Sequence, residues 1–357
     1  CSCRMKEIWV ITGASGFIGS RLASLLLEEL LASGATDVEI CCLVRKTSDT
    51  SQLAFLCQQG IIKNLCSVVP VNLCDPKELA TRIPVDSVGY IYHCAAKGGD
   101  WGPRDEFVQA NLTATKSLVE FASQCSNLKR FLHVSTVDVY PYLHPRDCHE
   151  NVEPIKTSKY HYSHTKADAE RVLTQSGVPW TIVRPAVVYG PYSYTWGLQE
   201  AILINQGKGV LIDGANYKSG AIYVDDLVEA IILASRSPVA LGRKYNACDP
   251  TSGTWKEFYD GIADSLGKPR VTFSIPFWLA WIVTFVLEFI WRLLRFEDRP
   301  LLTFFLLRLV GNDQDWPISR AQEDFGWVPR TSLKEGMDKM MQWLHKTNLY
   351  ADDAFLH

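Results

Sequence analysis

Residues 12–19 read Thr-Gly-Ala-Ser-Gly-Phe-Ile-Gly, and this stretch decides the fold. It follows a short β-branched run and opens a long amphipathic pattern, the context in which spaced glycines carry meaning. Gly13 permits a tight turn, Gly16 lets a pyrophosphate approach the backbone N–H groups at the positive end of a helix, and Gly19 permits close packing. Glycines also serve ordinary βα turns, but this position favours a dinucleotide site. The residues expected to bind there are Gly13, Ser15, Gly16, Phe17, Ile18 and Gly19.

Outward from this turn, short β-branched runs alternate with longer amphipathic stretches. The expected strands are 8–12, 38–44, 67–71, 89–93, 129–135 and 180–184, and the clearest helical patterns are 16–31, 107–124 and 160–175. Helices of this length allow right-handed crossovers that place the strands parallel. The sequence therefore predicts an α/β fold, a doubly wound parallel sheet with a smaller C-terminal substrate lobe. We expect a Rossmann dinucleotide-binding and catalytic domain over 5–190, and a lobe over 191–350 interleaved with late Rossmann elements.

The composition is that of an ordinary globular protein and excludes several classes. Of 357 residues, 47% are hydrophobic and 21% charged, and 36 basic against 39 acidic residues give a formal net charge of -3. The sequence has no long run of basic residues that would bind the phosphates of a nucleic acid, so we expect no nucleic-acid partner. Eleven scattered cysteines lack metal-ligand spacing, so we expect no metal site and a reducing compartment. No secretory signal is evident, and residues 1–4 read as an upstream extension.

One apolar segment departs from the globular pattern. Between Arg270 and Glu288 lie 17 uncharged residues rich in Trp and Phe, short of the roughly 20 that span a bilayer. Indole rings favour the boundary between headgroups and acyl chains, so we expect 271–308 to associate with a membrane surface within one leaflet. The alternative is a helix that packs on the domain and lines an apolar pocket.

Three residues are candidates for proton transfer. Tyr162 and Lys166 are four apart on an expected helix and share one face, and Thr136 ends the strand that leads to the same cleft. A free tyrosine titrates near pH 10, and a nearby ammonium lowers that pKa and can hold the nicotinamide ribose. Thr136 would hydrogen-bond the substrate oxygen while Tyr162 transfers the proton. A chance YxxxK pattern and a threonine that only caps local backbone are the structural alternatives.

The second expected strand ends at Arg45, where NAD-binding folds usually carry an acidic residue. A guanidinium matches a 2′-phosphate through paired hydrogen bonds, so NADP(H) is favoured over NAD(H), with Lys46 as a further contact. The alternative is that Arg45 stacks on adenine or is solvated.

With these motifs in order, the chain resembles the extended short-chain dehydrogenases/reductases, above all their 3β-hydroxysteroid and sterol-4α-carboxylate dehydrogenase branch. The matching stretches are TGASGFIG at 12–19, Asn72-Leu73, His93-Cys94-Ala95-Ala96, Asn111, STVDVY at 135–140, YSHTK at 162–166, Arg184-Pro185, YGP at 189–191, YVDD at 223–226, ISRA at 318–321 and FGWVP at 325–329.

The resemblance implies the roles of particular residues. It implies Thr136, Tyr162 and Lys166 as the catalytic set. It adds Asn72, Leu73, Ala95, Ala96 and Pro185 to the dinucleotide-binding residues, with Ala95 beside the adenosine and Pro185 beside the nicotinamide. Asn111 would hold a water near Lys166 or brace two helices, and Asp225 and Asp226 would be structural. Asn72 and Arg45 depart from the acidic residues of NAD-dependent relatives, which leaves room for an NADPH-driven ketoreductase.

The sequence thus predicts an NAD(P)-dependent oxidoreductase that interconverts a secondary alcohol and a ketone on a large hydrophobic, steroid-like or other lipid substrate. The alternatives are a nucleotide-sugar epimerase or dehydratase and a dihydroflavonol-type ketoreductase; the intact YSHTK speaks against a non-catalytic dinucleotide sensor. The expected partners are a hydrophobic small molecule and a membrane surface, with a homodimer left open. We expect the catalytic domain to face the cytosol, at the endoplasmic reticulum if the source is eukaryotic.

Overall fold

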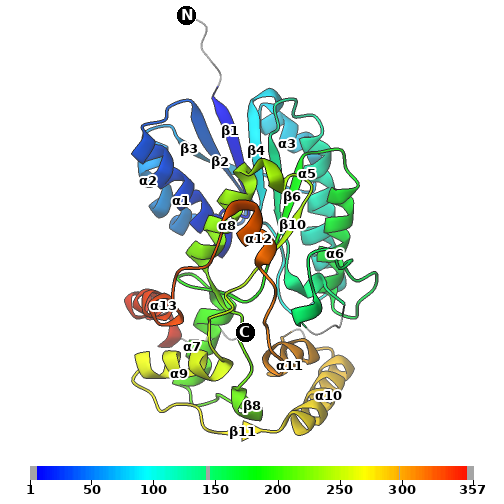
Figure 1. Ribbon diagram of the computed structural model, residues 1–357, viewed down its shortest axis with the longest axis vertical. Coiled ribbons are helices and arrows are strands. Elements are labelled where there is room, and N and C mark those ends of the chain that lie inside the picture. The colour runs from blue at the N-terminus through cyan, green and yellow to red at the C-terminus, as the bar shows by residue number, and fades with distance from the viewer. Residues whose placement is uncertain (1–5, 142–144, 297, 352–357) are drawn as a thin grey trace, which may run out of the picture.

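The computed structural model describes residues 6–141, 145–296 and 298–351 (Figure 1). The proposed upstream extension, residues 1–4, lies outside the described residues. The helices and strands are β1 (Glu7–Thr12), α1 (Phe17–Ser33), β2 (Val38–Val44), α2 (Ser51–Ile62), β3 (Cys66–Pro70), α3 (Pro76–Arg82), β4 (Val88–His93), α4 (Arg104–Phe107), α5 (Ala114–Ala122), β5 (Arg130–Val134), α6 (His161–Thr174), β6 (Trp180–Pro185), β7 (Val188–Tyr189), α7 (Glu200–Asn205), β8 (Leu211–Ile212), β9 (Ile222–Tyr223), α8 (Val224–Arg236), β10 (Lys244–Ala247), α9 (Trp255–Ser265), β11 (Ser274–Ile275), α10 (Phe277–Leu294), α11 (Phe304–Val310), α12 (Ser319–Phe325) and α13 (Leu333–Thr347).

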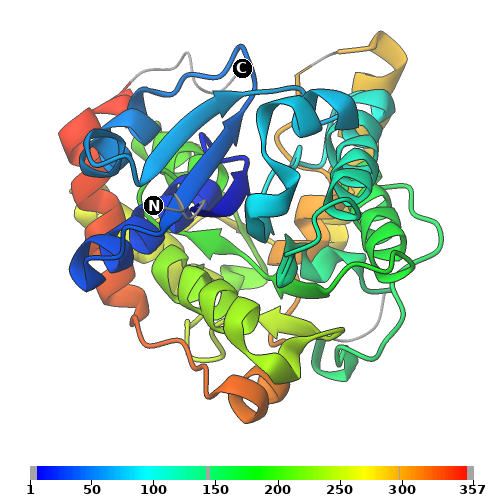
Figure 2. The same ribbon diagram turned by 90° about the horizontal axis from the view of Figure 1, so that it is seen from above.

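Seven parallel strands form one sheet in the order β10-β6-β5-β4-β1-β2-β3. The expected doubly wound α/β fold is therefore confirmed. Helices α1 and α8 pack on one face, and α3, α5 and α6 pack on the other, as the view from above shows (Figure 2). Strands β1, β2, β4, β5 and β6 are mostly buried on both faces, whereas the edge strand β3 is only partly buried.

The expected long helix over 107–124 is interrupted near its start. It consists of α4, a π-helical stretch at Val108–Thr113, and α5. The wider turn places Asn111 in the interior, where its Nδ2 donates to the Lys97 carbonyl and to Thr165 Oγ1, both at 3.0 Å, and its Oδ1 accepts from the Lys97 N–H at 2.7 Å. Asn111 thus ties the segment after β4 to α6, as in the bracing interpretation.

The later part of the chain builds a lobe beyond the carboxyl ends of the strands. Helices α7, α9, α10, α11 and α13 and the short strands β8 and β11 lie at this end, while α8 and β10 return to the sheet (Figure 1). The carboxyl ends of the strands therefore face this lobe (Figure 1).

A buried ion pair joins the sheet to the helix that carries the expected catalytic tyrosine. Arg184 on β6 donates from Nε and Nη2 to the two carboxylate oxygens of Glu170 on α6, at 2.9 and 2.6 Å, and both side chains are almost fully buried. The guanidinium also lies 4.6 Å from the centre of the Tyr140 ring. Burial disfavours the charged carboxylate, but the charge and hydrogen bonds of Arg184 hold the pKa of Glu170 below its ordinary value.

We predict that Glu170→Gln lowers the free energy of unfolding by about 3–5 kcal/mol, because it leaves the Arg184 charge buried without a counterion. The Glu170 contribution is full above pH 4.5, its ordinary pKa, and is lost as pH falls through the lower folded-state pKa. Urea denaturation near pH 7 and near pH 3 measures both effects. Asp338→Asn, in an exposed pair with Lys334, is the matched control and should change stability little. Equal effects of the two variants at pH 7 would contradict the assignment.

Candidate active site

The turn after β1 forms a tightly packed backbone cradle. Gly13 has φ 65°, and a Cβ there would lie 2.8 Å from the backbone of Ala95; a Cβ at Gly19 would lie 2.3 Å from the Gly13 carbonyl oxygen. Helix α1 begins after Gly16 without a side-chain cap, so its first N–H groups remain available to an anion. These features fit the pyrophosphate of a dinucleotide. Ser15, Phe17 and Ile18 are partly buried in the same turn.

A chain of hydrogen bonds fixes the loop after β4 against this turn. The Ala95 N–H donates to Thr12 Oγ1 at 3.1 Å, and Thr12 Oγ1 lies 2.7 Å from His93 Nδ1. His93 Nε2 lies 2.9 Å from Thr115 Oγ1, which donates to the Asn111 carbonyl. Burial and then the charge of Lys166 lower the pKa of His93 to about 3. A neutral ring that accepts at Nδ1 and donates at Nε2 satisfies every partner.

The end of β2 places Arg45 on the surface. The polar residues near it, Lys46 and Asn72, bind other parts of the protein. Lys46 Nζ lies 3.0 Å from Glu78 Oε1, so its charge is already paired. Asn72 Oδ1 accepts from the Cys74 N–H at 3.1 Å within a turn. Of the other expected dinucleotide contacts, Leu73 is partly buried, Ala96 is exposed, and Pro185 is buried at the end of β6.

Thr136 and Tyr162 lie together beyond β5, and a carboxylate that the sequence analysis did not single out joins them. The Thr136 hydroxyl donates to Asp138 Oδ2 at 2.8 Å, and the Asp138 N–H donates back to Thr136 Oγ1 at 3.2 Å. Burial and then the charge of Asp138 raise the pKa of Tyr162, against a smaller opposing effect of its hydrogen bond with Thr136. The expected lowering by Lys166 is therefore not what the structure shows. The sequence signal that could have identified Asp138 is its position, two residues after Thr136.

Lys166 is buried, and its ammonium faces β5 rather than solvent. Its Nζ donates to the Val134 carbonyl at 2.7 Å and lies 3.2 Å from His133 Nε2. Burial lowers the pKa of Lys166 to about 8, which still leaves it mostly charged at neutral pH. Burial, followed by this charge, also lowers the pKa of His133 well below its usual range. One positive charge therefore sits beside the neutral rings of His93 and His133.

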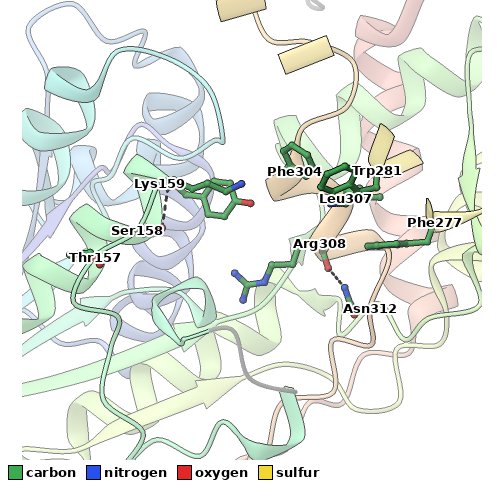
Figure 3. A pocket seen from close by; sticks show the side chains of 10 residues that line it. Thr157, Ser158, Lys159, Phe277, Trp281, Phe304, Leu307, Arg308 and Asn312 are labelled. Carbon is green, nitrogen blue, oxygen red and sulfur yellow. Dashed lines mark hydrogen bonds between the residues drawn. The ribbon is translucent and has the colours of Figure 1, made fainter. Parts of the chain in front are cut away.

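A pocket of about 720 Å³ lies between the segment that precedes α6 and the helices α10 and α11 (Figure 3). The catalytic candidates do not line it directly, but Tyr160 does, two residues before Tyr162. Most of its walls are apolar, and two cations enter it. The lining residues are Thr157, Ser158, Lys159, Tyr160, Phe277, Trp281, Phe304, Leu307, Arg308 and Asn312.

The fold also gathers three cysteines that are distant in sequence. The Sγ atoms of Cys42, Cys57 and Cys66 lie within 4.8 Å of one another, although no metal-ligand spacing joins them in the sequence. All three are buried within the core beside α1 and α2. Hydrogen bonds with Cys57 and Cys66, together with burial, raise the pKa of Cys42. Hydrogen bonds with Cys42 and Cys66 lower the pKa of Cys57 to about 4, and the three thiols lie close enough to share a metal ion, a grouping that the sequence spacing did not predict.

Asp225 and Asp226 act structurally, through different partners. The carboxylate of Asp225 accepts two hydrogen bonds from Arg21 on α1, at 2.6 and 2.9 Å. Asp226 Oδ2 accepts from the Thr331 N–H at 3.0 Å, and its carbonyl accepts from Trp327 Nε1. Both residues therefore brace α8 at the start of the lobe.

Comparisons with known proteins agree with this geometry. The chain is 28% identical over 279 residues to a 2-alkyl-3-oxoalkanoate reductase from Stenotrophomonas maltophilia, covering 75% of this chain and 84% of the relative. It is 21% identical over 355 residues to a mouse decarboxylating sterol-4-alpha-carboxylate 3-dehydrogenase, covering 96% and 92%. The fold resembles UDP-glucuronic acid 4-epimerase from Bacillus cereus in complex with NAD, with a TM-score of 0.69, 21% identity and coverage of 96% and 99%.

A family model described as the NAD dependent epimerase/dehydratase family matches residues 9–248. This match runs from the first strand of the central sheet to its last, and includes the glycine turn and the Tyr162 and Lys166 positions. The chain therefore belongs to the NAD-dependent epimerase/dehydratase family.

Proposed function

We propose that the protein is an NADPH-dependent ketoreductase, which reduces a ketone to a secondary alcohol on a large hydrophobic molecule, sterol-like or another lipid. The observation that carries this proposal is the Thr136–Tyr162 pair beyond the end of β5, together with an apolar pocket that Tyr160 lines two residues before Tyr162. Tyr162 is protonated at neutral pH, as any tyrosine is, so its hydroxyl carries the proton that reduction of a carbonyl requires.

Each catalytic candidate has a distinct part in this chemistry. The bound nicotinamide supplies the hydride. Tyr162 donates its proton to the substrate oxygen, while the Thr136 hydroxyl orients that oxygen after turning away from Asp138, to which it donates in the structure. Lys166 compensates the phenolate that forms, because its ammonium is held in a buried, low-dielectric position on the same helix.

The relatives support an oxidoreductase more than an epimerase. The names of the Stenotrophomonas and mouse proteins denote a reductase and a dehydrogenase, acting on an oxoalkanoate and a sterol carboxylate. The second candidate function is epimerisation or dehydration of a nucleotide sugar, favoured by the family and by the cations Arg308 and Lys159 in the pocket. The aromatic walls at Phe277, Trp281 and Phe304 argue against a sugar nucleotide.

The exposed end of β2 supports the choice of NADPH. Arg45 is exposed there, where the ribose of the dinucleotide's adenosine would lie, and Lys46 is neutralised by Glu78. The guanidinium of Arg45 can therefore bind a 2′-phosphate. The acidic residue that would bind a ribose hydroxyl of NAD is not found at this position.

Helix α10 supports attachment to a membrane surface. Its inner side carries Ala280 and Thr284, which are buried, whereas Trp278 is 64% and Phe289 59% exposed. Phe277 and Trp281 line the pocket, as expected for a helix that packs on the domain. Most of the apolar face of α10 is nevertheless exposed. A continuous exposed apolar face with tryptophans fits the headgroup boundary of a bilayer.

For the catalytic proposal, we predict that Tyr162→Phe lowers turnover of an apolar ketone with NADPH by about 100-fold to 10,000-fold, the usual contribution of general acid catalysis. The dissociation constant for NADPH, measured by fluorescence, should stay unchanged. Tyr160→Phe, two residues away, is the matched control and should keep most of the turnover. Near-normal turnover of Tyr162→Phe would remove this residue from its role.

For the cofactor, we predict that NADPH binds at least about ten-fold more tightly than NADH, as one charge-assisted contact implies. Arg45→Ala should bring the two dissociation constants together. Lys63→Ala, which removes an equal charge at the end of α2, should keep the preference. Tighter binding of NADH to the unaltered protein would contradict the assignment.

For the membrane, we predict that the protein sediments with phospholipid vesicles and stays bound in high salt, since the attachment is apolar. The triple variant Trp278→Ser, Phe285→Ser and Phe289→Ser should remain in the supernatant, because it removes exposed rings but spares Trp281 in the pocket. Arg292→Gln, on the same helix, should sediment as before. If the wild-type protein is monodisperse without detergent and does not sediment with the vesicles, the proposed membrane attachment is wrong.

A further inference from the structure

Three cysteines from three different elements meet in the core at the β3 edge of the sheet. Cys42 lies on β2, Cys57 on α2 and Cys66 at the start of β3, and their Sγ atoms lie within 4.8 Å of one another. The Sγ atoms of Cys42 and Cys66 are 3.8 Å apart. None of the three cysteines lines the pocket of α10 and α11, so the proposed function does not account for their grouping.

A glycine brings α2 close enough to β3 for the thiols to meet. Gly60 lies three residues after Cys57, and therefore on the same face of α2. A Cβ at Gly60 would lie 2.4 Å from a methyl carbon of Leu27 and 3.1 Å from the Cβ of Cys66. The Gly60 carbonyl accepts the Leu65 N–H at 2.7 Å, where the chain turns from α2 into β3. The bare backbone at Gly60 thus sets how near Cys57 lies to Cys66.

The spacing of the three sulfurs suits one metal ion at their centre. Thiolate sulfur binds a closed-shell ion such as Zn²⁺ at about 2.3 Å, so three sulfurs around a central ion form a triangle with sides of about 4.0 Å. The separation of Cys42 and Cys66 is close to that length, and the Cys57 sulfur lies within 4.8 Å of both. Small rotations of the side chains would complete the triangle. The alternative is a group of thiols that share hydrogen bonds and pack as small apolar side chains.

We propose that Cys42, Cys57 and Cys66 form a trigonal thiolate site for a soft monovalent cation, Cu⁺. Structural Zn²⁺ is almost always held by four ligands, and among the described residues this cluster supplies three. The side chains are 0%, 0% and 4% exposed, which disfavours water as a fourth ligand. Thiolates select Cu⁺ because both are soft. Each thiol that binds the ion releases its proton to solvent.

A bound ion would clamp α2 to the edge of the sheet. It would join Cys42 on β2 to Cys57 on α2, and so fix both ends of the connection over residues 45–50. Helix α2 lies beside α1 at the β3 edge (Figure 1), so local opening of this outer helix gives the ion a way in. We expected no metal site from the sequence because the three cysteines come together only through the fold.

The test titrates the reduced full chain with Cu⁺ in the absence of oxygen. Cu⁺ is supplied as its bathocuproine disulfonate complex, whose loss of absorbance measures transfer to the protein. We expect one tightly bound equivalent, with three sulfur neighbours by X-ray absorption spectroscopy. Cys57→Ser should weaken this binding at least about 100-fold, because changes to residues that only support a metal ligand already cost about 10-fold to 100-fold. Circular dichroism checks that the variant is folded, and Cys66→Ser is a second variant with the same expected loss.

Two controls separate the cluster from the other thiols. Cys41→Ser changes the buried neighbour of Cys42, whose side chain belongs to the core on the other face of the sheet, and should keep the tight equivalent. The double variant Cys1→Ser and Cys3→Ser removes the N-terminal thiols and should keep it as well.

Four outcomes would overturn the proposal. These are no transfer of Cu⁺ from its complex, a tight equivalent that survives Cys57→Ser or Cys66→Ser in a folded variant, fewer than three sulfur neighbours in the X-ray absorption of the wild type, and tight binding of Zn²⁺, added as its chloride, without binding of Cu⁺. The wild-type spectrum decides the question even if both serine variants fail to fold. None of these measurements involves turnover or the dinucleotide, so the proposed ketoreductase stands or falls separately.

Discussion

The close approach of the glycine turn to the backbone after β4 is the constraint on which the rest of the site depends. No side chain fits at Gly13 against Ala95, or at Gly19 against Gly13. This contact brings α1 to the gap between β1 and β4, where the strand order reverses and open α/β sheets bind their ligands. The hydrogen bonds from Thr12 through His93 then hold the second loop in place. The dinucleotide cradle is thus set by backbone geometry.

Helix α6 carries two buried charged side chains, Lys166 and Glu170. The ammonium of Lys166 lies next to two buried imidazoles, and these remain neutral because burial and this charge both oppose a second proton. One turn further along the same face of α6, the Glu170 carboxylate pairs with Arg184 on β6, and its charge also raises the pKa of Lys166 against the larger lowering by burial. The Lys166 ammonium itself is held by the Val134 carbonyl at the end of β5, two residues before Thr136.

The sheet and the glycine turn were predictable because their signals are local: a β-branched run, three glycines and an amphipathic helix. Strand limits agree to within a few residues, as at β2 and β6. The partners of Lys166 and the thiol cluster of Cys42 depend on contacts between distant segments, which no local pattern encodes. The π-helical turn at Asn111 was also hidden, because a polar residue in an amphipathic stretch reads as the outer face of a regular helix.

Helix α10 shows how an apolar surface and a substrate pocket can be coupled. Its inner side is small and polar: Thr284 donates to the Ala280 carbonyl, and Glu288 Oε1 accepts the Phe304 N–H at the start of α11. This bond ties the helix with the exposed apolar face to the helix that carries Arg308. Because Phe277 and Trp281 of α10 and Leu307 of α11 line the same pocket, this bond also holds the apolar wall of that pocket together.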